Sequence, residues 1–112
     1  MIGCDIVKIE RFNKLIDNKN FLNKYFTMDE QNYINSKTSK VQTMAGIYSA
    51  KEAVLKALHK GIGSGINLLD VQICHQEGGA PYALVNNETL PVSISHDGEY
   101  AFAVCLVNGK IC

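Results

Sequence analysis

The fold depends most on residues 41–60, VQTMAGIYSAKEAVLKALHK, which we expect to form one long helix. Its larger apolar side chains recur every three or four residues, the spacing of a helix with one buried side. A second side carries only small residues, Ala50, Ala53 and Ala57, and suits the close approach of another element. A helix that is apolar on two sides is predicted to lie at the centre of the molecule.

Glu52 and Lys56 stand on the polar strip between these two sides. Because four residues separate them, both side chains project from one side of the helix and offer an anion and a cation together. One interpretation is an exposed ion pair, which contributes only a few tenths of a kcal/mol. The other is a functional pair, in which the Lys56 ammonium binds a phosphate group.

Three glycines, Gly61, Gly63 and Gly65, follow this helix. Glycine readily adopts the left-handed conformation that ends a helix, so a helix end and a turn is the preferred interpretation. A phosphate-binding loop would instead precede a helix and place the helix N-terminus against the anion. The loop could still let a nucleotide approach the backbone closely.

Residues 2–7 alternate as a strand, with Ile2, Cys4 and Ile6 on one side and Gly3, Asp5 and Val7 on the other. A carboxylate within an apolar strand is costly unless something compensates its charge. Asp5 is therefore either an edge residue that accepts backbone hydrogen bonds or a metal ligand. Magnesium, which binds a few carboxylates together with waters and substrate phosphates, suits the second alternative.

The segment between this strand and the long helix is predicted to be helical. Residues 9–16 place apolar side chains at helical spacing. Thr27 and Glu30 then form a capping-box pattern that opens a second helix toward Ser36, and we assign Glu30 to capping and not to catalysis. Residues 36–40 are a polar loop.

The remainder of the chain is predicted to form strands at residues 70–75, 82–85, 91–96 and 100–107. Asp97 and Gly98 are a favoured two-residue turn between the last two. His96 ends a strand just before that turn, where it either satisfies local hydrogen bonds or contacts a ligand phosphate or base. The outline is α+β, an antiparallel sheet packed against a long central helix and shorter helices. A length of 112 residues predicts a single domain, residues 1–112.

Composition narrows the class of protein. Apolar residues make up 46% of the chain, which argues against intrinsic disorder. Eleven basic and eleven acidic residues give a net charge of zero. This argues against a general nucleic-acid binder, which would carry a strong basic excess. Basic side chains gather between Lys8 and Lys24, either as a solvated face or as a docking surface for an acidic partner. The four cysteines show no metal-ligand spacing. We also find no signal peptide and no apolar run of membrane-spanning length, so we expect a cytoplasmic protein.

The order and the residues of these motifs resemble those of one known family. The segments are Ile2–Ile6, Ile9–Phe12, Phe21–Glu30, Ala45–Ala57, Gly61–Gly63 and Val92–Ala101. Together they are similar to the holo-[acyl-carrier-protein] synthases, the short bacterial branch of the 4′-phosphopantetheinyl transferase superfamily. The similarity extends over essentially the whole chain.

This resemblance implies a Mg²⁺-dependent transfer of 4′-phosphopantetheine from coenzyme A to a serine of apo acyl carrier protein, as used in fatty acid biosynthesis. Adenosine 3′,5′-bisphosphate would be released. It also implies a homotrimer with active sites between subunits, and neither a nucleic-acid nor a membrane partner. The implied roles are magnesium binding by Asp5 and Glu52 and catalysis by Glu52 and Lys56. Coenzyme A binding is implied for Lys56, Gly63 and His96, and carrier-protein binding for Arg11 and Lys14.

One departure from the family pattern concerns the central helix. The family often has A-G-R-[FW]-A-A-K-E, whereas this chain has Ile47 in place of the arginine, followed by Tyr48 and Ser49. Lys51 is a candidate to replace that cation. Ile47 also motivates a second hypothesis, a non-catalytic relative that binds carrier proteins or coenzyme A. A small metal-dependent phosphohydrolase is a third.

Overall fold

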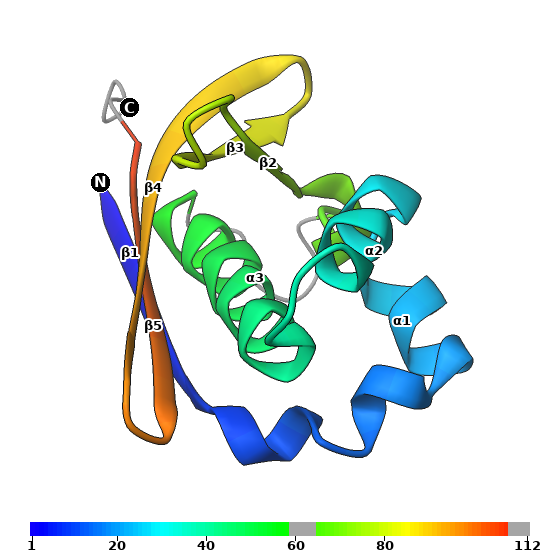
Figure 1. Ribbon diagram of the computed structural model, residues 1–112. Helices are drawn as coiled ribbons and strands as arrows, with labels where there is room; N and C mark the ends of the chain where they lie inside the picture. Colours follow the sequence, from blue (N-terminus) through cyan, green and yellow to red (C-terminus); the bar gives the residue numbers. More distant parts are fainter. Residues whose placement is uncertain (59–64, 108–112) are drawn as a thin grey trace.

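The computed structural model describes residues 1–58 and 65–107, in which a five-stranded antiparallel sheet curves around one long helix (Figure 1). The strand order is β1-β5-β4-β3-β2. The strands are β1 (Ile2–Lys8), β2 (Gln72–His75), β3 (Pro81–Val85), β4 (Glu88–Asp97) and β5 (Tyr100–Leu106). The helices are α1 (Lys19–Tyr25), α2 (Met28–Asn35) and α3 (Lys40–Ala57), with short 3-10 helices η1 (Ile9–Phe12), η2 (Leu15–Asp17) and η3 (Leu68–Asp70). The predicted α+β architecture is confirmed.

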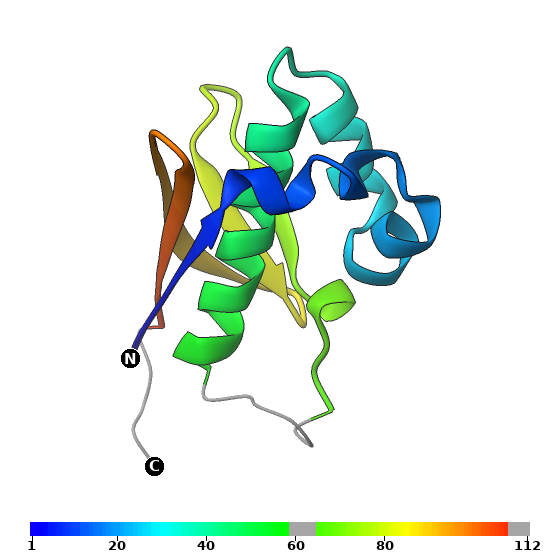
Figure 2. The same cartoon turned by 90° about the horizontal axis from the view of Figure 1, so that it is seen from below.

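Strand β1 lies alongside α3 (Figure 2), and the small residues of α3 face it. Ala53 and Ala57 are fully buried there, and Gly3 is the β1 residue that faces them. A Cβ atom on Gly3 would lie 2.0 Å from the Ala53 carbonyl oxygen and 2.4 Å from the Ala57 nitrogen. Backbone therefore touches backbone at this point, and this contact fixes the distance between β1 and α3.

Replacing Gly3 by alanine is accordingly expected to lower the free energy of unfolding by about 1–3 kcal/mol or more, because β1 and α3 must move apart. Gly78→Ala is the matched control, since a Cβ atom at Gly78 meets nothing within 4 Å. Urea denaturation of both variants measures the difference. Equal stabilities would show that the contact is not as close as described.

The two sides of β1 have opposite environments. Gly3 and Val7 are buried toward α3, with Asp5 partly covered between them. The more apolar side faces outward, where Ile2 is 70% and Ile6 is 59% exposed. On neighbouring β5, Phe102 and Leu106 are opposite these two residues and are also exposed. The outer face of β1 and β5 is therefore an exposed apolar surface.

Both hairpins that flank β4 differ in detail from the prediction. Asp97 pairs with Tyr100, so the turn residues are Gly98 and Glu99, and the predicted Asp97-Gly98 turn is shifted by one residue. Gly98 has φ +57°, which suits the first central position of a type II′ turn. The other end of β4 begins at Glu88, earlier than the predicted residue 91. It follows a two-residue loop whose asparagines, at 86 and 87, have φ values of 49° and 67°, as a type I′ turn requires.

The helical predictions are confirmed in α2 and α3 but not in the first segment. Thr27 and Glu30 form the predicted capping box at the start of α2. Residues 9–16 do not form one helix. They hold η1 and the beginning of η2, and a separate helix, α1, follows with Asn18 as its N-cap. The long helix ends at Ala57, and the predicted residues 59 and 60 lie outside the described part of the chain.

A buried ion pair joins α2, α3 and β2. The Lys51 ammonium donates to Glu30 Oε1 at 2.5 Å, and both side chains are completely buried. Glu30 Oε1 also accepts from the Thr27 N–H, and its Oε2 accepts from the Ile73 N–H at 2.7 Å. Burial lowers the pKa of Lys51, and the adjacent Glu30 opposes that shift. Lys51 is thus part of the core, and its suggested role as a substitute cation for a nucleotide phosphate is wrong.

Candidate functional site

Asp5 of β1 and two residues of α3 come together at one flank of the helix. Lys56 Nζ donates to Asp5 Oδ1 at 3.0 Å. The Ser49 hydroxyl donates to the Asp5 backbone carbonyl at 2.8 Å and so fixes this point of β1 against the helix. The Asp5 side chain is 13% exposed whereas that of Lys56 is 55% exposed. The Asp5 carboxylate is therefore largely buried, and the Lys56 ammonium lies on its solvent-exposed side.

Glu52 completes the cluster of Asp5, Glu52 and Lys56, which we name the Asp5 cluster. Burial raises the pKa of Glu52 above its ordinary value of 4.5, and the negative charge of Asp5 raises it further. Lys56 and Arg11 oppose the shift. Two carboxylates that repel each other in a half-buried position are stabilised by any cation that binds between them.

The donor atoms fit a hard divalent cation. Asp5 Oδ2 is buried and has no hydrogen-bond partner. An unsatisfied carboxylate oxygen beside a second acid is the arrangement that a Mg²⁺ ion would compensate. Within residues 1–58 and 65–107, no group of three or more histidine, cysteine, aspartate or glutamate side chains could hold a metal. The protein thus offers two carboxylates, and waters or a phosphate ligand would supply the other oxygens.

Arg11 lies closer to this cluster than the sequence indicated. It is exposed on η1. The pKa values of Glu52 and Tyr48 are both raised, and the positive charge of the Arg11 guanidinium opposes both shifts. Lys14 is also exposed and lies just before η2. Both residues remain candidates for contact with an acidic partner.

Tyr48 is a neighbour of the cluster that the sequence analysis did not assign. Burial and the negative charge of Glu52 raise the pKa of its phenol. Its ring packs on those of Phe12, Phe21 and Phe26, with centroids 5.2 to 6.3 Å apart. The spacing from residue 48 to Glu52 is itself i,i+4, and this signal could have found it.

His96 lies away from this cluster and meets α3 in its N-terminal half. Its Nε2 is 3.2 Å from the Gln42 carbonyl oxygen, and because a carbonyl can only accept, Nε2 carries the hydrogen. Gly46 allows this approach, since a Cβ atom there would lie 3.0 Å from His96 Nε2. The structure therefore does not bring His96 together with Asp5 in one chain. Gly63, the remaining candidate, lies outside the described residues.

His96 instead lines a cavity of about 200 Å³ between α2, α3 and the strands. Its wall is formed by Tyr33, Thr43, Gly46, Ile47, His75, Gly79, Pro81, Ile94 and His96. No carboxylate is among these residues, and two imidazoles are. Ile47 contributes an apolar side chain that is 1% exposed, so the departure from the family arginine falls in this wall. We name this space the His96 cavity.

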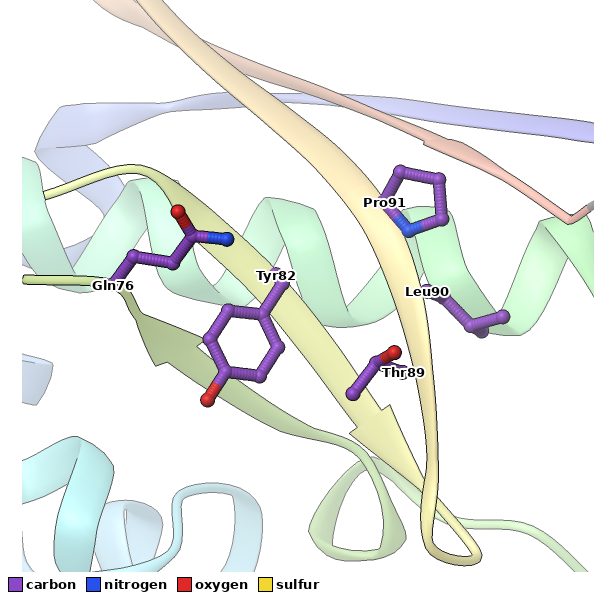
Figure 3. Close-up of a pocket in the computed structure, with 5 residues that line it drawn as sticks. All are labelled: Gln76, Tyr82, Thr89, Leu90 and Pro91. Atoms are coloured by element: carbon purple, nitrogen blue, oxygen red, sulfur yellow. The ribbon is translucent and has the colours of Figure 1, made fainter. Parts of the chain in front are cut away.

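A second hollow lies on the outer face of the sheet, on the side away from α3 (Figure 3). It measures about 490 Å³ and is lined by Gln76, Tyr82, Thr89, Leu90 and Pro91. It is larger than the His96 cavity, but its wall contains no acid, histidine or lysine. The acid, lysine and histidine candidates therefore lie at the Asp5 cluster and the His96 cavity and not in this hollow.

Comparison with known proteins identifies the family. Residues 1–105 match the ACPS family, described as the 4′-phosphopantetheinyl transferase superfamily. A holo-[acyl-carrier-protein] synthase from Thermoanaerobacter sp. (strain X514) is 38% identical over 120 residues, which cover 96% of this chain and 86% of that protein. The chain belongs to the 4′-phosphopantetheinyl transferase superfamily.

Solved structures of superfamily members have the same fold. The holo-[acyl-carrier-protein] synthase of Helicobacter pylori in complex with coenzyme A is 34% identical, with a TM-score of 0.82. The match covers 96% of this chain and all of that chain. The Bacillus anthracis synthase in complex with CoA (3′,5′-ADP) is 32% identical, with a TM-score of 0.81 and 93% and 91% coverage. Among the described residues of this superfamily member, no helix is long and apolar enough to cross a membrane.

Proposed function

We propose that this chain is a holo-[acyl-carrier-protein] synthase, which transfers 4′-phosphopantetheine from coenzyme A to a serine hydroxyl of apo acyl carrier protein. The product would serve fatty acid biosynthesis, and adenosine 3′,5′-bisphosphate would leave. The observation that carries this proposal is the match of residues 1–105, with full-length relatives of that name. Residues 1–112 act as one domain in this proposal.

The Asp5 cluster is the proposed reaction centre. Asp5 and Glu52 would hold Mg²⁺, and the unsatisfied Asp5 Oδ2 and the repulsion between the two acids support this assignment. When bound, the ion would neutralise charge on the coenzyme A diphosphate. Lys56 adds a second positive charge at the solvent side of the pair, where an incoming phosphate would arrive.

The transfer requires one bond to form and one to break. The serine oxygen attacks the phosphorus on the pantetheine side of the diphosphate, and the bond to adenosine 3′,5′-bisphosphate breaks. The serine proton goes either to Glu52 directly or to a water that Glu52 orients. A raised pKa makes Glu52 a better proton acceptor than an ordinary glutamate.

Ionised Glu52 is needed for both roles, which predicts a pH dependence. Protonation removes the charge as pH falls through its raised pKa, so kcat/KM should decline on the acid side above the ordinary value of 4.5. Arg11 lowers the pKa of Glu52, so Arg11→Gln should move this acid limb to higher pH. Measuring kcat/KM against pH at subsaturating Mg²⁺ tests this. An acid limb that stays in place in the variant would contradict the assignment of Glu52.

The nucleotide end of coenzyme A is proposed to occupy the His96 cavity, and Gly63 is proposed as a further coenzyme A-binding residue. His96 contacts α3 in its N-terminal half, whereas Asp5 contacts Ser49 and Lys56 farther along the helix. One coenzyme A molecule would accordingly bridge the His96 cavity of one subunit and the Asp5 cluster of another. The exposed apolar surface of β1 and β5 supports such an association. We propose a homotrimer, which the sedimentation mass in solution would test.

Arg11 and Lys14 are proposed to bind the acidic carrier protein. Both side chains are exposed, and Arg11 stands beside the reaction centre, where the serine must enter. Charge reversal in Arg11→Glu should raise the KM for the carrier by about tenfold or more while changing the KM for coenzyme A little. Steady-state kinetics with each substrate varied in turn measures both. Equal effects on the two KM values would remove the docking role.

The cysteines suit the proposed reducing, cytoplasmic location. Cys4, Cys74 and Cys105 are free thiols in the described chain. Cys105 is fully buried as a small apolar residue, and burial raises its pKa to about 11. Cys4 is exposed on the outer face of β1.

One assay separates the proposed activity from its alternatives. Apo carrier protein is incubated with the chain, coenzyme A and Mg²⁺, and its intact mass is measured. A gain of one phosphopantetheine arm is expected. An unchanged mass with tight coenzyme A binding would instead indicate a non-catalytic relative. Release of adenosine 3′,5′-bisphosphate without any carrier would indicate a phosphohydrolase.

A further inference from the structure

Lys56 and Asp5 form an ion pair whose two members differ in their freedom to move. Lys56 Nζ donates to Asp5 Oδ1 at 3.0 Å. The Asp5 side chain is 13% exposed, and the Ser49 hydroxyl holds the Asp5 backbone against α3. The Lys56 side chain is 55% exposed and carries its ammonium on a flexible four-carbon stem. The carboxylate is therefore fixed, whereas the ammonium can move toward solvent without disturbing the fold.

The same ammonium compensates both acids of the Asp5 cluster. Lys56 follows Glu52 by four residues on α3, so the two side chains leave the helix on one side. The positive charge of Lys56 opposes the shift that burial and Asp5 impose on the pKa of Glu52. Lys56 thus supplies, from within the chain, the positive charge that two neighbouring carboxylates require.

A paired Lys56 opposes the binding of a divalent cation at these carboxylates. Like charges repel each other strongly in a partly buried site, where solvent and salt screen them less than in water. Asp5 Oδ1 is also engaged with Lys56 and becomes available to a cation only when that contact lengthens. An anionic group at the solvent side has the opposite effect, because it attracts the ammonium away from Asp5. Release of Lys56 from Asp5 therefore favours both ligands.

We propose that Lys56 is a built-in counter-ion that keeps the affinity of the Asp5 cluster for a free divalent cation low until a diphosphate ligand draws its ammonium away. The inference rests on the proposed function, in which coenzyme A supplies the diphosphate. Two arrangements of one side chain, paired and released, couple the two ligands, since each ligand binds the released arrangement better. The coupling is reciprocal, so a bound cation strengthens diphosphate binding by the same factor.

The test measures Mn²⁺ binding by electron paramagnetic resonance, first to the protein alone and then with coenzyme A. No carrier protein is added, so no transfer occurs. Lys56→Met removes the charge and keeps most of the length of the side chain. Without coenzyme A, this variant should bind Mn²⁺ about tenfold more tightly than the unmodified protein, within the usual range of coupling between two sites. Lys56→Gln should show the same gain, whereas Lys56→Arg, which keeps the charge, should bind Mn²⁺ as the unmodified protein does.

The effect of coenzyme A tests the coupling itself. Coenzyme A should strengthen Mn²⁺ binding in the unmodified protein by a factor about tenfold larger than in Lys56→Met, because the variant has no ammonium to release. An equal factor in the two proteins would overturn the coupling.

Lys8→Met is the matched control. Lys8 lies on β1, as Asp5 does, and its side chain is 48% exposed, but its ammonium is 3.9 Å from Glu10. This variant loses one positive charge, and its Mn²⁺ affinity should stay within about twofold of that of the unmodified protein. An equal gain in Lys8→Met, or no gain in Lys56→Met and Lys56→Gln, would overturn the inference. Coenzyme A binding by the unmodified protein would still uphold the proposed function, and its absence would overturn both.

Discussion

Glu52→Gln is expected to lower kcat by about 10²–10⁴-fold, the range for loss of a general base, with a further loss at low Mg²⁺. Glutamine has nearly the same shape as glutamate but lacks the negative charge that binds and neutralises a divalent cation. The adjacent Asp5 would then bear the ion alone. Asp5→Asn should act in the same direction, because it removes the second charge from the pair.

Turnover measured over a range of Mg²⁺ concentrations distinguishes metal binding from a general loss of structure. Both variants should need more Mg²⁺ for half-maximal activity. Glu10→Gln is a control from the same part of the molecule, since Glu10 is an exposed acid paired with Lys8 at 3.9 Å. Full turnover of Glu52→Gln at low Mg²⁺ would rule out the proposed centre.

Lys51→Met is expected to lower the free energy of unfolding by about 3–5 kcal/mol, which is a large part of the stability of a small domain. The substitution leaves the Glu30 carboxylate buried without its counter-charge. Glu30 also holds the Thr27 N–H of α2 and the Ile73 N–H of β2. Loss of the ion pair therefore loosens three elements at once.

Urea denaturation at neutral pH gives the measurement. Lys40→Met, an exposed position on the same helix, should change stability by no more than about 0.5 kcal/mol. The double variant Glu30→Gln/Lys51→Met should lose less stability than the two single variants lose together. With both substitutions present, no unpaired charge is left in the core. A cost for Lys51→Met equal to that for Lys40→Met would show that the pair is not buried.

Local patterns predicted the elements well where the relevant contacts are close in sequence. The capping box at Thr27 and Glu30 needs only residues three apart, and it is present. The small-residue side of α3 was predicted from spacing alone, and its contact with Gly3 confirms it. The first helix was wrong because apolar spacing does not distinguish two 3-10 turns from one α-helix.

Long-range contacts account for what the sequence could not predict. Glu30 was assigned to capping alone, since nothing near it in sequence reveals that Lys51 and Ile73 reach the same carboxylate. Alternation in β1 defined two sides but not which one faces inward. That choice is made by α3, which can approach only the side with Gly3. Likewise the approach of Lys56 to Asp5 depends on how β1 crosses the helix.

The pairing of the first strand, β1, with the last, β5, has a consequence for folding during synthesis of the chain on the ribosome. β1 is an edge strand whose partner is β5, and the Met1 amino group donates to the Val107 carbonyl at 3.0 Å. On the ribosome, Glu52 and Lys56 emerge long before the residue that pairs with Asp5, Ala103. A nascent chain that stops short of β5 therefore leaves β1 without its sheet. Assembly of the centre therefore awaits the synthesis of β5, and such non-local pairing is also the slow kind to form.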